Sequence, residues 1–132
     1  MKTLTALLLC CLALVFSGCS LAGGGGCVHL PPKNVKAGAP IALNIEFSVF
    51  GKASGPLDKR YTQVTCHYRD SAKTEFQTVA AAVLSADEKT MTAVMVIPPA
   101  TLSGATQIDY YFDFLFDGVY NRRDEAPLKI EP

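Results

Sequence analysis

The chain has 132 residues, and its 12 Lys and Arg are balanced by 12 Asp and Glu. This length suits one small domain and is too short for two ordinary ones. The cations are scattered along the chain, and the pair Arg122-Arg123 is followed directly by Asp124 and Glu125. Because phosphate recognition needs clustered Lys and Arg, the composition argues against nucleic acid as a partner.

Residues 1–18 predict an export signal. Lys2 precedes an uncharged apolar run from Leu4 to Phe16, and small residues follow at Ser17 and Gly18. A charged start, an apolar centre and a small-residue end form the outline of such a signal. The run is shorter than the about 20 apolar residues that cross a bilayer. We therefore expect a signal peptide and no permanent membrane span.

The stretch Phe16-Ser17-Gly18-Cys19 resembles the lipobox of bacterial lipoproteins. The resemblance implies that Cys19 is lipidated and becomes the mature N-terminus. Its diacylglyceryl and N-acyl groups would then anchor the protein stably, as one fatty chain would not. Ser20 after the cysteine implies sorting to the outer membrane of the cell envelope, facing the periplasm or the outside. The alternative is an ordinary secretory signal that is cleaved nearby.

A glycine-rich segment follows the predicted lipidation site. Four consecutive glycines, residues 23–26, favour a random coil. We therefore assign residues 19–34 to the lipidated Cys19 and a flexible tether, and residues 35–132 to the folded domain.

Two of the five cysteines are left for the domain. Cys10 and Cys11 leave with the signal and Cys19 takes the lipid, so Cys27 and Cys66 remain. In an oxidising compartment two remaining cysteines most simply form a disulfide. Free or intermolecular thiols are a further possibility.

A metal site is a sharper alternative for the same cysteines. Cys27, His29, Cys66 and His67 together could bind zinc or copper tetrahedrally. If Cys66 and His67 lie on a strand, however, their side chains point to opposite faces. We therefore expect no metal and no cofactor, and both histidines at the surface or at a sheet edge.

Alternating apolar positions predict β-strands through the rest of the chain. The strongest pattern is residues 106–118, where five bulky side chains share one face. Asp117-Gly118 then signals a hairpin turn. Residues 76–79 favour a strand, and the alanine run after them is left open. The expected inward-facing sets are Ile41, Leu43, Ile45, Phe47 and Val49; Val64, Cys66 and Tyr68; Met91, Ala93, Met95 and Ile97; and Ile108, Tyr110, Phe112, Phe114 and Phe116.

Six to eight short strands without an amphipathic helix indicate one antiparallel β-sandwich. The order VTCHYR, FQTV, MTAVMVIP, IDYYFDF and DG also resembles immunoglobulin-like and fibronectin type III-like modules of bacterial envelope proteins. That resemblance implies an immunoglobulin-like sandwich and no functional residue. The fold class is therefore all-β.

No motif for catalysis is present, so we expect no enzyme. His67 has no serine and carboxylate beside it in the sequence. Asp109, Asp113 and Asp117 are four positions apart, or about 13 Å along a strand, which is too far to share one calcium ion. We expect these aspartates to be solvated and to pair with Arg122 or Arg123. A calcium site at Asp117, Asn121 and Asp124 would need their loop to curl.

The expected function is a non-enzymatic docking or structural module, held at the membrane by its lipid, for another envelope or secretion component. Sheet edges would bind the protein partner, for instance by strand addition. The alternative is a surface module that binds a glycan or another small ligand. Its candidate exposed aromatic residues are Phe50, Tyr61, Tyr111 and Tyr120.

Overall fold

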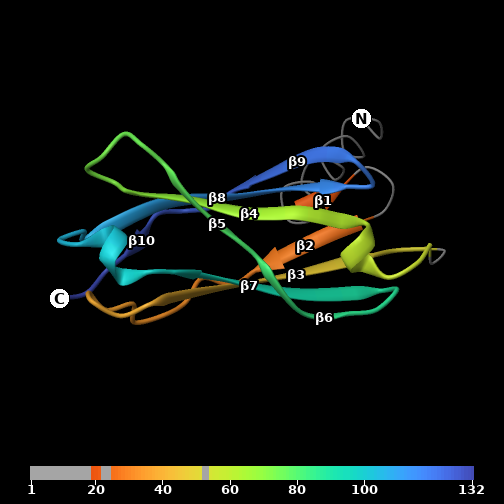
Figure 1. The fold of residues 1–132 in the computed structure, drawn as a ribbon, viewed down its shortest axis with the longest axis horizontal. Helices are drawn as coiled ribbons and strands as arrows, with labels where there is room; N and C mark the ends of the chain where they lie inside the picture. The colour runs from red at the N-terminus through yellow and green to blue at the C-terminus, as the bar shows by residue number, and fades with distance from the viewer. Residues whose placement is uncertain (1–18, 22–24, 52–53) are drawn as a thin grey trace, which may run out of the picture.

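The computed structural model describes residues 19–21, 25–51 and 54–132. The described chain is all-β, and its strands form two antiparallel sheets that face each other (Figure 1). The prediction of an antiparallel β-sandwich is confirmed. No helix among the described residues is long and apolar enough to cross a membrane. The predicted signal, residues 1–18, lies outside the described residues.

One sheet, the β3/β7 sheet, has the strand order β1-β2-β3-β7-β6. Its central register places Phe47 opposite Cys27 on one side and opposite Met91 on the other. Its strands are β1 (Cys19–Leu21), β2 (Gly25–His29), β3 (Ile41–Val49), β6 (Ala82–Ala86) and β7 (Thr90–Ile97).

The other sheet, the β4/β8 sheet, has the order β10-β8-β4-β5, and β9 also pairs with β8. Two short 3-10 helices, η1 (Leu57–Lys59) and η2 (Pro99–Leu102), lie in the connections. The strands are β4 (Tyr61–Asp70), β5 (Gln77–Ala80), β8 (Gln107–Phe116), β9 (Val119–Asp124) and β10 (Leu128–Lys129).

The core lies between the sheets and consists of the inward side of each strand. The predicted inward sets of β3, β4, β7 and β8 are buried, apart from the half-buried Val49 at the end of β3. Aromatic rings form its centre: Phe47 lies 4.9 Å from Phe114 and 4.4 Å from Tyr61 between ring centroids. Strand alternation alone therefore located most of the core.

The turn between β8 and β9 is the predicted hairpin. Asp117 and Gly118 both have positive φ, at 47° and 80°. Positive φ at both central residues defines the turn that suits the twist of a two-residue hairpin. The Asp-Gly signal in the sequence is confirmed.

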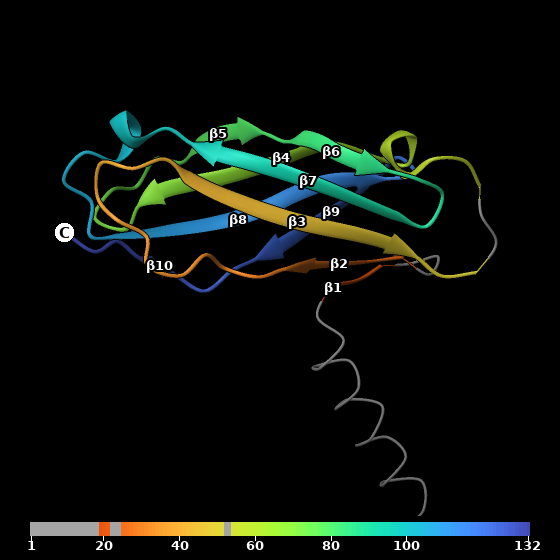
Figure 2. The ribbon, with the colours of Figure 1, turned by 90° about the horizontal axis from the view of Figure 1, so that it is seen from below.

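The chain crosses from one sheet to the other between β5 and β6. In Figure 1 the green segment passes from the upper layer to the lower, and in Figure 2 β5 and β6 follow each other along one side of the sandwich. The backbone N–H of Ala81, between the two strands, donates to the carbonyl oxygen of Val64 at 2.9 Å. The alanine run that the sequence left open thus spans the crossing: Ala80 ends β5, and Ala82 begins the edge strand β6.

The predicted tether needs correction, because part of residues 19–34 belongs to a sheet. Residues 25–29 form β2, which pairs with β3 from Gly25 opposite Val49 to His29 opposite Ile45. Cys27 and His29 are buried and alternate with the exposed Val28. Two inward-facing side chains therefore hold the end of the glycine run against the domain.

Candidate functional site

The predicted Cys27–Cys66 disulfide is wrong. Cys66 is a buried free thiol on β4 in the β4/β8 sheet, whereas Cys27 lies on β2 in the other sheet. Cys27 is disulfide-bonded, and Cys66 is not its partner. Its neighbour across the ladder, by backbone register, is Cys19. Burial raises the pKa of the Cys66 thiol to about 12, so this thiol is not a nucleophile at neutral pH.

His29 is buried, which corrects the expectation of a surface or edge position. Its Nδ1 donates to the carbonyl oxygen of Asn44 at 2.5 Å, and its Nε2 forms a hydrogen bond with the Tyr110 hydroxyl at 3.0 Å. Tyr110 lies on β8, so the imidazole joins β2 of one sheet to the opposite sheet. His29 therefore has a structural task inside the sandwich.

Asp109, Asp113 and Asp117 do not form ion pairs with Arg122 or Arg123 as expected. Those arginines instead bind Asp124 and Glu125, two residues further along the chain. Among the described residues, no three His, Cys, Asp or Glu side chains are placed to hold a metal ion. The three aspartates have separate basic partners, which are Arg69 for Asp109, His67 for Asp113 and Arg60 for Asp117.

Several polar and aromatic side chains gather on the outer face of the β4/β8 sheet, and we call them the His67 cluster. Strand pairing brings them together, because His67 lies opposite Tyr111, and Asp113 lies opposite Arg122. His67, Tyr111 and Asp113 alternate with buried neighbours, so their side chains point outward. The cluster consists of His67 on β4, Tyr111 and Asp113 on β8, and Tyr120 and Arg122 on β9.

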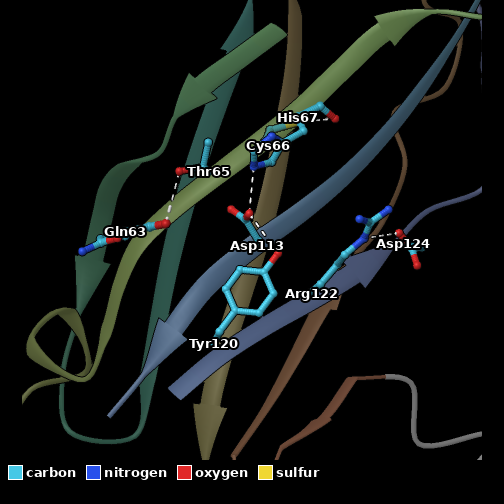
Figure 3. Close-up of polar contacts among 8 residues, drawn as sticks. All are labelled: Gln63, Thr65, Cys66, His67, Asp113, Tyr120, Arg122 and Asp124. Atoms are coloured by element: carbon cyan, nitrogen blue, oxygen red, sulfur yellow. Dashed lines mark hydrogen bonds and ion pairs between the residues drawn. The ribbon is translucent and has the colours of Figure 1, made fainter. Parts of the chain in front are cut away.

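Asp113 is the centre of the His67 cluster. Its Oδ2 lies 2.8 Å from His67 Nε2 and accepts a hydrogen bond from the Tyr120 hydroxyl at 3.2 Å (Figure 3). Partial desolvation and the nearby Asp113 carboxylate raise the pKa of Tyr120. The Tyr120 hydroxyl therefore keeps its proton and remains a donor at neutral pH.

Tyr111 holds the rest of the cluster through its ring. The His67 imidazole stacks on it with 4.4 Å between centroids and 6° between planes. The Arg122 guanidinium carbon lies 3.7 Å from the centre of the same ring. Such contacts restrict long side chains, so the face is ordered before any ligand arrives.

A bulge in β4 shapes the surface beside the cluster. The pairing of β4 with β8 shifts between Thr62 and Thr65, and Gln63 has a positive φ of 52°. The Thr65 hydroxyl donates to the carbonyl oxygen of Gln63 at 3.2 Å across this bulge. Bulges of this kind re-aim side chains and are common beside functional sites.

An open pocket of about 230 Å³ lies at this bulge. Polar side chains meet apolar surface in it, with His67 and Asp113 beside Leu115 and the exposed ring of Tyr120. The pocket is lined by Gln63, Thr65, His67, Asp113, Phe114, Leu115 and Tyr120.

The pocket suits binding better than covalent chemistry. A nucleophile would have to hydrogen-bond to His67, and the Thr65 hydroxyl bonds to Gln63 instead. The sequence did not reveal the carboxylate beside His67, because Asp113 comes from another strand. The only signal available was that both residues fell on the outer sides of their predicted strands.

The expected set of exposed aromatic residues is partly wrong. Tyr61 is 2% exposed, because the β4 bulge shifts the alternation and turns this residue inward. Tyr111 is half-buried in the His67 cluster. Phe50 and Tyr120 are exposed at 71% and 59%, and of these two only Tyr120 lines the pocket.

No protein-family model matches this sequence, and no curated protein matches it significantly.

Proposed function

We propose that this chain is a bacterial envelope lipoprotein whose immunoglobulin-like β-sandwich is a non-enzymatic docking or structural module. The lipid on Cys19 would supply the location, at the outer membrane, and the sandwich would bind another envelope or secretion component. The observation that carries the docking part is strand β6, an edge of the β3/β7 sheet whose five residues are all exposed and uncharged.

The anchor part depends on the sequence around Cys19 and on its place in the fold. The lipobox-like stretch ends at Cys19, which is also the first residue of β1. A lipid at this position would join the domain at the edge of the β3/β7 sheet. The sandwich would then stay close to the bilayer.

Strand β6 has the properties of an edge open to strand addition. It pairs only with β7, and all five of its residues are exposed, including Val83 at 49% and Leu84 at 62%. Edges are usually protected by charged residues, Pro or bulges; β6 has no charged residue and no Pro, and its pairing with β7 shifts register once, between Val83 and Ser85. An extended partner segment could pair with its free backbone groups.

The outer face beside β6 favours an apolar partner. Val96 on β7 is 45% exposed and lies opposite the exposed Ala42 on β3. Ala82 on β6 lies opposite the half-buried Val94. A partner strand on β6 could therefore also contact these small aliphatic side chains.

The anchor is tested by the intact mass of the protein extracted from membranes after expression with its own signal. We expect a chain that begins at Cys19 and carries diacylglyceryl and N-acyl groups. Lipidation forms a thioether at the Cys19 sulfur, and a disulfide would use the same sulfur. The intact mass therefore distinguishes a lipidated Cys19 from a disulfide-bonded one. Cys19→Ala should abolish processing and anchoring, whereas Cys27→Ala should leave both intact. A mature chain without acyl groups contradicts the proposal.

Docking is tested by crosslinking in intact envelopes. The wild-type protein should give one adduct of constant mass, and Leu84→Lys should remove it by placing a charge on the β6 edge. Asn44→Lys is the matched control, because it adds the same charge on the exposed face of β3, two strands from that edge. Melting temperatures verify that both variants fold. An adduct that persists in Leu84→Lys contradicts docking through β6.

A further inference from the structure

We propose that the pocket of the His67 cluster binds a neutral saccharide, one sugar ring at a time. This activity goes beyond docking and lies in the opposite sheet from β6. The juxtaposition of an exposed tyrosine ring, an imidazole and a carboxylate around one open pocket carries the inference.

The apolar part of the pocket suits the C–H face of a sugar. Tyr120 is 59% exposed, and its hydroxyl is held by Asp113 at 3.2 Å, which limits the orientations of the ring. Leu115 lies opposite Tyr120 in the β8–β9 ladder and lines the same pocket. An amphipathic ligand is the natural occupant of a site that pairs an aromatic ring with polar groups.

The polar part of the pocket suits hydroxyl groups. The cluster's bonds use only Oδ2 of Asp113, and no hydrogen bond among the described residues uses its Oδ1. A carboxylate oxygen accepts hydrogen bonds strongly, and the Tyr120 and Thr65 hydroxyls, whose protons go to Asp113 and Gln63, can still accept through their oxygens. A sugar with neighbouring hydroxyls can donate to such a set of acceptors.

The charges around the pocket favour a neutral ligand over an ion. The Asp113 carboxylate disfavours phosphate and other anions. A ligand cation would find Asp113 already paired with His67 and the Tyr111 ring already occupied by the Arg122 guanidinium. A volume of about 230 Å³ is below the about 300 Å³ of the smallest drug-sized pockets, which fits a single ring.

The inference is tested by saturation-transfer NMR on the full-length protein, in a detergent without a sugar headgroup. The probes are the methyl glycosides of glucose, galactose, mannose and N-acetylglucosamine, together with choline and inorganic phosphate. We expect saturable binding of at least one glycoside, with a Kd on the order of 1 mM. Its ring C–H protons should receive the strongest saturation, because they face Tyr120.

Variants locate the binding site. Asp113→Asn should weaken binding about ten-fold or more through loss of a charge-assisted hydrogen bond, and Tyr120→Ala should abolish detectable binding. Tyr120→Phe keeps the ring and should weaken it less. Asp109→Asn is the matched control, because it removes a carboxylate from the same face of β8 outside the pocket.

The proposal is overturned if no glycoside binds saturably, if choline or phosphate binds instead, or if Asp113→Asn and Tyr120→Ala bind as the wild type does. The melting temperature of each variant verifies its fold. These outcomes are independent of β6, so failure here leaves the docking proposal standing, and the reverse also holds.

Discussion

The two outer faces of the sandwich have the same backbone geometry and different chemistry. On the β4/β8 sheet, His67 and Tyr120 bind Asp113, and Arg122 lies on the ring of Tyr111. On the β3/β7 sheet the outward side chains are aliphatic, polar or charged. Among the described residues, no side-chain hydrogen bond is made by the central ones, which are Ala42, Asn44, Glu46, Thr92, Val94 and Val96. The first face carries a network of polar and aromatic contacts, whereas the second combines aliphatic and polar side chains beside an open edge.

Truncating a core side chain between the two sheets should have the largest effect on stability, because both outer faces depend on the packing of this core. Phe112 is fully buried, and its ring centroid lies 4.8 Å from that of His29. We expect Phe112→Ala to lower the free energy of unfolding by about 3–5 kcal/mol in urea denaturation. Phe50→Ala, at a residue that is 71% exposed, should change it by less than about 0.5 kcal/mol. If both substitutions changed the free energy of unfolding equally, the burial of Phe112 in the core would be contradicted.

Breaking the polar link between the sheets should have the next largest effect. His29→Leu leaves the carbonyl oxygen of Asn44 and the hydroxyl of Tyr110 without their partner, at a cost of about 2–3 kcal/mol in the free energy of unfolding. Tyr110→Phe removes only one hydrogen bond and should cost about 1 kcal/mol. Denaturation of both variants measures the difference. If His29→Leu costs no more than Tyr110→Phe, the imidazole does not join the sheets as described.

High pH should lower the stability of the fold through ionisable groups in the same core. Burial raises the pKa of Tyr61 and of Cys66 to about 12 each, whereas in the unfolded chain these groups ionise near their ordinary values. Between the two values the folded chain holds more protons than the unfolded chain, so stability falls as pH rises.

The measurement is the melting temperature between about pH 8 and pH 12. We expect a decline of several degrees that begins near pH 9 to 10. Tyr61→Phe also removes the hydrogen bond from the Tyr61 hydroxyl to the carbonyl oxygen of Ser48, 2.7 Å long, which joins β4 to β3. The melting temperature of Tyr61→Phe should be lower than that of the wild type at the start of the pH range, and it should decline less steeply as the pH rises. A wild-type curve that is flat over this range would contradict the burial of these groups.

The smallest effect is expected for an ion pair on the polar face. Arg69 donates to Asp109 at 3.1 Å and lies over the ring of Phe76, but both charged side chains are about one third exposed. Arg69→Gln should change the free energy of unfolding by less than about 1 kcal/mol. Glycoside binding should also be unchanged. A loss above about 2 kcal/mol would mean that this face is ordered mainly for stability.

The sequence was sufficient for the interior of the sandwich and for its sharpest turn. Alternation identified the buried sides of β3, β4, β7 and β8, and Asp117-Gly118 identified the hairpin. It failed at Tyr61 because a bulge shifts the alternation by one residue, which no pattern in the sequence announces. It failed at β2 because a run of glycines carries no side-chain pattern, although Cys27 and His29 are buried.

The candidate site could not be assembled from the sequence, because it depends on the register of separate strands. His67 and Asp113 meet only when β4 and β8 pair as they do, and Tyr120 joins them through the β8–β9 hairpin. Strand patterns give the face of each residue and leave the register open. The immunoglobulin-like topology and the lipid anchor stay predictions.

Site-specific photocrosslinking in living cells tests the contrast between the two faces most directly. A photoreactive residue replaces Leu84 on β6 in one strain and Tyr120 in the His67 cluster in another, with the native signal kept in both. We predict one protein adduct of constant mass from position 84 and none from position 120. An adduct from position 120 alone, or none from either position, would contradict docking through the β6 edge.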